Sequence, residues 1–227
     1  MRRPRIALLN ASQAPSTPRN FRRELDADLV EFDVQQDVPD TFAFDAAVVT
    51  GSRASVYWDE PWIRSLEEWV SAAAERDMPV LGICFGHQLL AEALGGIVED
   101  MGEYEIGYRE VEGDGLLLDD TVTVFTTHSD TVTELPPGAE RTAENDYGIH
   151  GFRVGNAFGV QFHPEYDMDT AESVTRGKDL PDERIQTVLD GITEENYAKA
   201  CEAKTLFENF TEQVRDVRDE QMAERIA

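Results

Sequence analysis

Residues 79–96 constrain the fold more strongly than any other part of the chain. They read PVLGICFGHQLLAEALGG, so that an apolar run enters a glycine-flanked turn at residues 82–86 and a helical pattern begins at once. A buried strand that passes directly into a helix is a building block of α/β sheets. The helix is expected over residues 87–94, because Gly95 and Gly96 are typical of a helix C-terminus.

The same alternation recurs along the chain. Apolar runs bounded by turn residues predict strands at residues 5–9, 29–33, 46–50 and 79–84, with later strands near 149–154 and 158–162. Residues 106–124 are expected to form short β pieces. A helix is predicted after Pro61, with an apolar face made by Trp62, Leu66, Trp69, Val70 and Ala73. We interpret both tryptophans as core residues rather than as parts of a cofactor site.

The chain after Tyr166 has a helical and heavily charged pattern. Its last helix presents one apolar face, made by Leu206, Phe207, Phe210, Val214 and Val217. Such a face suits packing on the domain or on a partner, and cover for the core is the simpler expectation. Since no repeat or linker-like run interrupts the chain, we predict one domain over residues 1–227, with a core to about residue 167 and a helical extension over 168–227.

The charge balance excludes one class of partner. The chain has 46 acidic and 20 basic residues, a net charge of −26, and the acids are dispersed along it. Phosphate contacts need basic clusters, so nucleic-acid binding is not expected. Dispersed acids describe a solvated surface and predict adaptation to a salt-rich cytoplasm, where salt screens self-repulsion.

Apolar segments give no sign of a membrane protein. No run approaches the length that spans a bilayer, so no membrane association is expected. The basic start MRRPRIALLN is too short in its apolar part for a secretory signal, and we interpret it as the first buried strand of a cytoplasmic protein.

The two cysteines differ in setting. Cys84 stands in the spacing G-x-C-x-G between a strand and a helix, which is the arrangement of a nucleophile elbow. The glycines relieve crowding there, and a helix N-terminus lowers a thiol pKa and offers N–H groups to an oxyanion. An ordinary buried cysteine would fit these five residues equally well. Neither Cys84 nor Cys201 has zinc-site spacing, and no metal or cofactor is expected.

A second strand end supplies a base and an acid. Residues 159–166 read GVQFHPEY, so that His163 and Glu165 follow an apolar strand across the rigid Pro164. A histidine at one strand end can reach a nucleophile at another, and a carboxylate can fix its tautomer. His87, His128 and His150 are weaker candidates: His87 is expected to cap or pack, His128 lies in a strand-to-loop segment, and His150 has no distinctive context.

Taken together, these motifs resemble those of the class I (Cys-His-Glu triad) glutamine amidotransferases. Residues 82–86 with Gln88 match the nucleophile motif, and residues 159–165 match the closing Gly-Val-Gln-Phe-His-Pro-Glu motif. Residues 128–130 (HSD) are similar to the glutamine-contacting loop, and residues 51–57 (GSRASVY) to the oxyanion loop of the GMP synthetase branch. The resemblance covers about residues 1–167. It implies a flavodoxin-like three-layer α/β sandwich, in which helices flank a central, mostly parallel sheet.

The resemblance also implies roles for particular residues. Cys84 would attack the glutamine amide to give a γ-glutamyl thioester and ammonia, with His163 as base and acid and Glu165 as the orienting carboxylate. The oxyanion would be bound by the N–H groups of Phe85 and of the Gly51–Ser52 loop. The amino-acid end of the substrate would be held by Gln88 and by the backbone around Ser129 and Asp130.

Two departures from the family pattern bear on function. The oxyanion loop commonly reads Gly-Gly-Pro, whereas this chain has Gly51-Ser52-Arg53, and the helical tail exceeds what a minimal amidotransferase needs. No P-loop and no Ser-Gly-Gly-x-Asp-Ser segment is present, so the chain is not expected to activate an acceptor with ATP by itself.

Several destinations for the ammonia therefore remain open. A separate ATP-dependent synthetase subunit could receive it, as in a GMP synthetase-type complex. Alternatively, the chain could hydrolyse glutamine or a γ-glutamyl amide or peptide on its own, and the departures slightly favour this stand-alone interpretation. A non-catalytic regulatory module would be expected to lack a triad residue. Cysteine peptidases and chaperone-like proteins of the same fold lack the His-Pro-Glu pair.

Overall fold

One sheet runs through the part of the chain that the structure describes. The computed structural model describes residues 2–224. The strands are β1 (Arg5–Asn10), β2 (Asp28–Asp33), β3 (Ala46–Val49), β4 (Val80–Ile83), β5 (Ile97–Gly113), β6 (Thr121–Glu134), β7 (Glu140–Asn145), β8 (Gly148–Val154) and β9 (Ala157–Val160). Their order in the sheet is β2-β1-β3-β4-β9-β8-β7-β5-β6. The predicted α/β architecture, with helices flanking a central sheet, is confirmed.

The parallel strands form the part of the sheet that places the predicted site. Strands β2, β1, β3, β4 and β9 pair in parallel, in a register that aligns Leu8 with Val48 and Val48 with Leu81. Their residues are fully buried in β3, β4 and β9, as their continuous apolar sequences predict. Because carboxyl ends of parallel strands meet at one edge, the segments that follow β3, β4 and β9 are brought together there.

Antiparallel strands extend the sheet beyond β9. Strands β5 and β6 are far longer than the short β pieces predicted for residues 106–124. A register shift between Asp100 and Glu105 interrupts their pairing, and charged residues occupy many of the exposed positions of β5. These interruptions hide the alternation of apolar and polar residues that marks a strand. The full length of this antiparallel ribbon, β5 and β6, therefore could not be predicted from the sequence.

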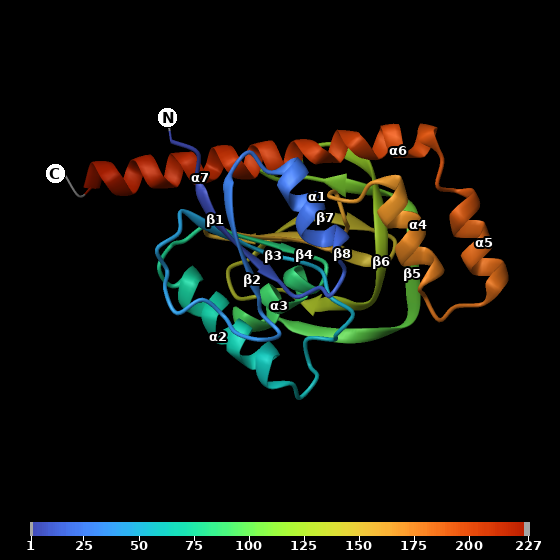
Figure 1. The fold of residues 1–227 in the computed structure, drawn as a ribbon, viewed down its shortest axis with the longest axis horizontal. Coiled ribbons are helices and arrows are strands. Elements are labelled where there is room, and N and C mark those ends of the chain that lie inside the picture. The colour runs from blue at the N-terminus through green and yellow to red at the C-terminus, as the bar shows by residue number, and fades with distance from the viewer. Residues whose placement is uncertain (1, 225–227) are drawn as a thin grey trace.

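Two helices cover one face of the sheet. Helices α1 (Ser16–Glu24) and α7 (Thr205–Glu224) lie side by side on it, and α7 extends from the region of α6 (Glu194–Ala200) to the end of the molecule where the C-terminus lies (Figure 1). The predicted apolar face of α7 is buried among residues of β1, β3, β4 and α1, including Phe21, whose ring meets Phe207 edge-on at 6.1 Å. Packing of this face on the core is confirmed. Helix α1 was not predicted, because its sequence STPRNFRRE contains a single large apolar residue.

The opposite face is covered by α2 (Pro61–Ala74) and α3 (Phe85–Ala93). The buried residues of α2 are Ile63, Leu66, Trp69, Val70 and Ala73. Trp62 is an exception to the predicted core face: it is only partly buried, its ring lies 5.5 Å from that of Phe85 at a tilt of 34°, and it lines a cavity. Helix α3 begins two residues before the predicted position, directly after Cys84.

The chain after residue 167 is helical, as predicted. It forms α4 (Met168–Arg176), α5 (Asp182–Asp190), α6 (Glu194–Ala200), a 3₁₀ turn (Cys201–Lys204) and α7. Ala171 of α4 packs with Ile106 and Phe125 of the antiparallel ribbon. The division into a core domain and an extension at residue 167 stays a prediction. Within residues 2–224, no helix combines the length and the apolar character needed to cross a bilayer.

Candidate active site

Cys84 occupies a strained turn between β4 and α3. Its backbone angles are φ 53° and ψ −104°, in the left-handed half of conformational space that side chains rarely adopt. A Cβ atom on Gly82 would lie 2.2 Å from the carbonyl oxygen of Gly86, and one on Gly86 would lie 2.3 Å from that of Val49. Both glycines of the motif are therefore required by close backbone approach.

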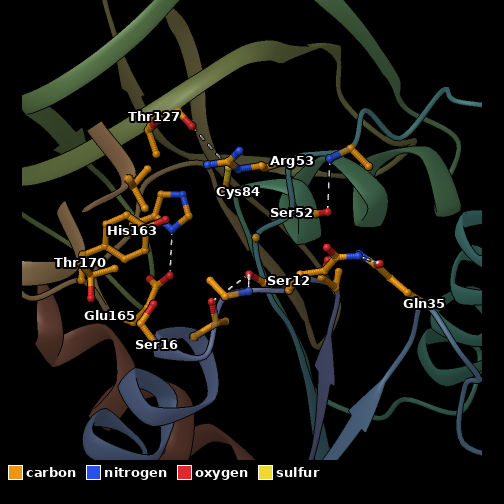
Figure 2. Close-up of a pocket in the computed structure, with 18 of the residues that line it drawn as sticks. Ser12, Ser16, Gln35, Ser52, Arg53, Cys84, Thr127, His163, Glu165 and Thr170 are labelled. Atoms are coloured by element: carbon orange, nitrogen blue, oxygen red, sulfur yellow. Dashed lines mark hydrogen bonds and ion pairs between the residues drawn. The ribbon is translucent and has the colours of Figure 1, made fainter. Parts of the chain in front are cut away.

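The thiol of Cys84 faces a cavity of about 630 Å³. Figure 2 shows this cavity between Cys84, His163, Ser52 and the β1–α1 loop with Ser12. Cys84 is the N-cap residue of α3, where the helix dipole favours a negative charge. Its Sγ atom lies 4.0 Å from the carbonyl oxygen of Thr127 on β6. The thiol is thus reachable from the cavity and placed where a thiolate is stabilised.

His163 and Glu165 form a buried pair beside this thiol. The Nδ1 atom of His163 lies 2.8 Å from Oε1 of Glu165, and the imidazole stacks on Tyr166 at 4.1 Å. A Cβ on Gly51 would lie 2.8 Å from Cε1 of His163 and 3.7 Å from Cβ of Cys84, so both side chains adjoin Gly51. Burial alone would lower the pKa of His163, but the negative charges of Glu165 and Cys84 and hydrogen bonds to them raise it to about 10.

Unpaired backbone donors surround the same point. Phe85 is the first residue of α3, so its N–H has no acceptor one turn back in the helix. Within residues 2–224, the N–H groups of Gly51 and Ser52 donate to no other group of the protein. The Phe85 side chain itself is buried. The predicted oxyanion donors thus lie on the two segments that flank Cys84.

A second cavity of about 320 Å³ extends from Cys84 and Ser52 towards Gln88, Ser129 and Asp130. The amide of Gln88 donates to the carbonyl oxygen of Asp130 at 2.9 Å and to Oε1 of Gln161 at 3.0 Å. The structure therefore brings together all nine residues that the sequence singled out for the site.

The carboxylate of Asp130 is held by two hydroxyl groups. Ser55 donates to Oδ2 at 2.5 Å and Tyr57 donates to Oδ1 at 2.9 Å. Both hydroxyls come from the loop after β3, which the sequence matched to an oxyanion loop. The same loop thus borders the thiol at one end and orients an acidic side chain of the second cavity at the other.

Sequence reasoning missed several residues that line these cavities. The β1–α1 loop contributes Ser12, the first turn of α1 contributes Thr17, and the chain around α4 contributes Thr170 and Lys178. The ammonium group of Lys178 hydrogen-bonds the hydroxyl of Tyr104. Nothing in the local pattern around these residues indicates a site, because their role depends on which segments the fold places side by side.

The three weaker histidine candidates are all buried. His87 packs on the ring of Phe152 at 5.0 Å, and burial, assisted by the nearby His150 and His128, lowers its pKa to about 3. This agrees with the packing role expected for it. His128, which lines the second cavity, and His150 both meet Glu105. His150 therefore has a distinctive setting, which its sequence context does not reveal.

Comparisons with known proteins agree with this arrangement. The family model described as Glutamine amidotransferase class-I matches residues 19–176. A GMP synthase [glutamine-hydrolyzing] of Aromatoleum aromaticum is 36% identical over 155 residues, which are 59% of this chain and 28% of that relative. A protein of Haloarcula marismortui, named as one subunit of a GMP synthase [glutamine-hydrolyzing], is 45% identical over 100 residues, 39% of this chain and 52% of the relative. The chain thus spans about a quarter of the first relative and about half of the second.

Solved structures support the fold. A glutamine amidotransferase from Thermotoga maritima superposes with a TM-score of 0.76 at 23% identity, over 93% of this chain and 100% of that one. A glutamine amidotransferase from Methylobacillus flagellatus gives the same TM-score at 21% identity, over 95% of each chain. Since the family model spans more than half of the residues, this chain belongs to the class-I glutamine amidotransferase family.

Proposed function

We propose that this chain hydrolyses the side-chain amide of glutamine, with Cys84 as nucleophile, His163 as general base and acid, and Glu165 as the carboxylate that orients His163. One observation supports this most strongly. The 2.8 Å His163–Glu165 pair adjoins a cysteine held at φ 53° in a strand-to-helix turn. A nucleophile, a base and an orienting acid in this order make up a catalytic triad.

The proposed reaction begins from an ion pair in which Nε2 of His163 already holds the proton of the Cys84 thiol, the state that the raised pKa of His163 favours. The thiolate attacks the amide carbon of glutamine, and the negative oxygen accepts hydrogen bonds from the N–H groups of Phe85 and of Gly51 or Ser52. The imidazolium then gives its proton to the departing nitrogen, which leaves as ammonia. A water molecule then gives a proton to His163 and attacks the γ-glutamyl thioester, which releases glutamate and leaves Cys84 as the thiolate of the starting ion pair.

The amino-acid end of the substrate would lie in the second cavity. The Asp130 carboxylate borders that cavity and suits an α-ammonium group. Gln88 and the backbone at Ser129 would contact the rest of this end. Neither substrate binding nor the two chemical steps call for a metal or another cofactor.

The experiment that tests this function measures glutamate and ammonia release from glutamine in molar KCl. The Cys84→Ser variant should lose at least about a thousandfold in kcat, because the hydroxyl is a far weaker nucleophile than a thiolate. Cys201→Ser is the matched control, since Cys201 lies outside both cavities, and it should keep full activity. Equal activity of Cys84→Ser and wild type would refute the proposal.

The destination of the ammonia has two candidates. Relatives named GMP synthase, one of which is named as a single subunit of that enzyme, favour supply to a separate ATP-dependent synthetase. The roughly 630 Å³ cavity on the far side of Cys84 favours the alternative, a larger γ-glutamyl amide or peptide whose leaving amine occupies it. A higher kcat/KM for such amides than for glutamine would support the alternative. Stimulation of glutamine hydrolysis by cell extract would support a synthetase partner.

A further inference from the structure

Three buried titratable side chains meet beside the second cavity, and one of them, His128, lines it. They are Glu105 on β5, His128 on β6 and His150 on β8, and each is at most 5% exposed. Glu105 and His128 are direct cross-strand partners. None of the three takes part in the chemistry proposed above. Burying charged or polar groups at this depth is costly unless each is paired, so their arrangement calls for a reason.

The hydrogen bonds of His128 favour the doubly protonated form of its ring. Its Nδ1 atom lies 2.9 Å from the carbonyl oxygen of Asp130, which can only accept, so Nδ1 carries a proton. Its Nε2 atom lies 2.6 Å from Oε2 of Glu105. Both ring nitrogens therefore face acceptors, and a doubly protonated imidazolium opposite a carboxylate satisfies both contacts.

The surroundings of Glu105 fit an ionised carboxylate. Asn145 donates to its other oxygen, Oε1, at 2.8 Å, and the guanidinium of Arg109 lies 4.0 Å from that oxygen. Burial would raise the pKa of Glu105, but hydrogen bonds from His128 and His150 bring it well below its ordinary value. The pKa of His150 is lowered, chiefly by burial, so His150 adds no second charge near pH 7.

A metal ion is a poorer explanation of the same cluster. The ligand-type atoms of Glu105, His128 and His150 all lie within 4.8 Å of one another. However, two ligands of one tetrahedral zinc ion sit about 3.3 Å apart at ordinary bond lengths, whereas Glu105 and His128 are 2.6 Å apart. The shorter distance is that of a charge-assisted hydrogen bond.

The Glu105–His128 pair is joined through His128 to residues that line the second cavity. The pairing of β5 and β6 passes from Asp100–Asp130 directly to Glu105–His128, so Ser129 has no cross-strand partner. Its peptide groups are thereby left available to a ligand. On one side of this gap, the backbone carbonyl of Asp130 accepts hydrogen bonds from His128 and from Gln88. The side chain of Asp130 lines the second cavity.

We propose that the Glu105–His128 ion pair is a positioning unit, which holds Ser129 and Asp130 in the conformation that binds the amino-acid end of the γ-glutamyl substrate. The pair acts on substrate affinity and not on the thiol. This inference rests on the proposed glutamine-hydrolysing function.

The test compares two variants on the same strand. Glu105→Gln keeps the size of the side chain and removes its charge, whereas Glu110→Gln makes the same charge change at an exposed position. We expect Glu105→Gln to raise KM for glutamine at least about tenfold while kcat changes less than about threefold. Glu110→Gln should leave both constants unchanged. Circular dichroism verifies that each variant is folded.

Two alkylating reagents separate positioning from chemistry. Iodoacetamide reacts with the thiol without needing the amino-acid subsite, so its rate with Cys84 should be equal in wild type and Glu105→Gln. The glutamine analogue 6-diazo-5-oxo-norleucine carries the α-amino-acid group, and its inactivation rate should fall at least about tenfold. A fall in both rates would overturn the inference, since it would place the effect on the thiol.

Two measurements on the wild-type protein remain decisive if Glu105→Gln fails to fold. Nitrogen-15 NMR of the imidazole rings, recorded under the assay conditions, should find protons on both ring nitrogens of His128, as its two acceptor contacts require, and a singly protonated ring would overturn the inference. Stoichiometric zinc in the purified protein would also overturn it, because a cation would then join these side chains. A wild type that neither hydrolyses glutamine nor reacts with the analogue contradicts the proposed function instead, whatever the state of His128.

Discussion

At the scale of single residues, the site depends on a backbone that is strained at one point. The left-handed turn at Cys84 costs conformational energy, on the order of 1–3 kcal/mol for a residue with a side chain. Close packing around Gly82 and Gly86 holds the turn, because any side chain there would collide with backbone atoms. This turn places Cys84 at the wall of the cavity that His163 also lines, so the residues that cost stability also determine where the thiol lies.

Protonation of His163 should make stability depend on pH. The pKa of His163 is raised to about 10 in the folded protein, from an ordinary value near 6.5. The folded state thus holds this proton more tightly than the unfolded state. The stabilisation is fully present below pH 6.5 and is lost as the pH rises to about 10, by an amount on the order of a few kcal/mol.

Urea unfolding of wild type and Glu165→Gln at several pH values tests this expectation. Glu165→Gln removes the carboxylate that raises the His163 pKa, so the stability advantage of wild type should shrink between pH 6.5 and pH 10. The surface variant Glu110→Gln controls for the charge change and should differ from wild type by a constant amount. An advantage that stays constant or grows with pH for Glu165→Gln would contradict the assignment of the raised pKa.

At the scale of elements, the antiparallel strands β5 and β6 border the second cavity, whereas α7 covers the core. The register shift between Asp100 and Glu105 in β5 leaves Ser129 without a cross-strand partner, at a position that lines the second cavity. Helix α7 lies along the far side of the molecule from α2 and contributes no residue to either cavity (Figure 1). Its task is to cover the parallel strands.

Removing the central aromatic residue of α7 should therefore affect stability more than activity. Phe210 is fully buried and meets Phe158 edge-on at 6.3 Å. Phe210→Ala should lower the free energy of unfolding by about 3–5 kcal/mol, since it leaves a cavity under the helix. Urea titration gives this value, and Glu208→Ala, an exposed position on the same helix, should change it by less than about 0.5 kcal/mol.

The activity of this variant completes the test. Glutamine hydrolysis by Phe210→Ala, assayed below its unfolding transition, should remain close to wild type. A loss smaller than about 1 kcal/mol would indicate that α7 does not pack on the sheet as described.

At the scale of the whole molecule, the large negative net charge is expected to govern how stability depends on salt. The net charge of −26 is dispersed over the surface, and most ion pairs of the described residues involve exposed side chains, which contribute little each. Self-repulsion among the remaining acids destabilises the compact state at low ionic strength. Against this background, Arg53 and Lys178, which both line the two cavities, provide a local positive charge beside the site.

Salt should stabilise the molecule as a whole. At 1 M salt the screening length falls to about 3 Å, which removes most repulsion between surface carboxylates. Raising KCl from 0.1 M to 2 M should increase the melting temperature by at least about 5 °C, measured by scanning calorimetry. An equal osmolarity of sucrose separates screening from excluded-volume effects. A melting temperature that does not change with KCl would refute the proposed adaptation to salt.

The sequence by itself determined the parts of this protein whose partners lie close along the chain. The strand, the glycine-flanked Cys84 and the following helix are contiguous, and so are the strand, His163 and Glu165. Local sequence patterns specify such units, because turn residues and apolar runs determine the conformation of the backbone next to them. All five parallel strands, the turn positions of Cys84 and His163 at strand ends, and the apolar face of α7 were predictable for this reason.

Only the tertiary structure decided how distant segments meet. Glu105, His128 and His150 are separated by 22 or more residues, and no local period links a glutamate on one strand to histidines on two others. No local pattern predicts the hydrogen bond from Tyr57 to Asp130 either, or the position of Lys178 in the cavity wall. Buried polar pairs and cavity walls form between side chains that the sheet order brings together, and that order is a property of the packed molecule.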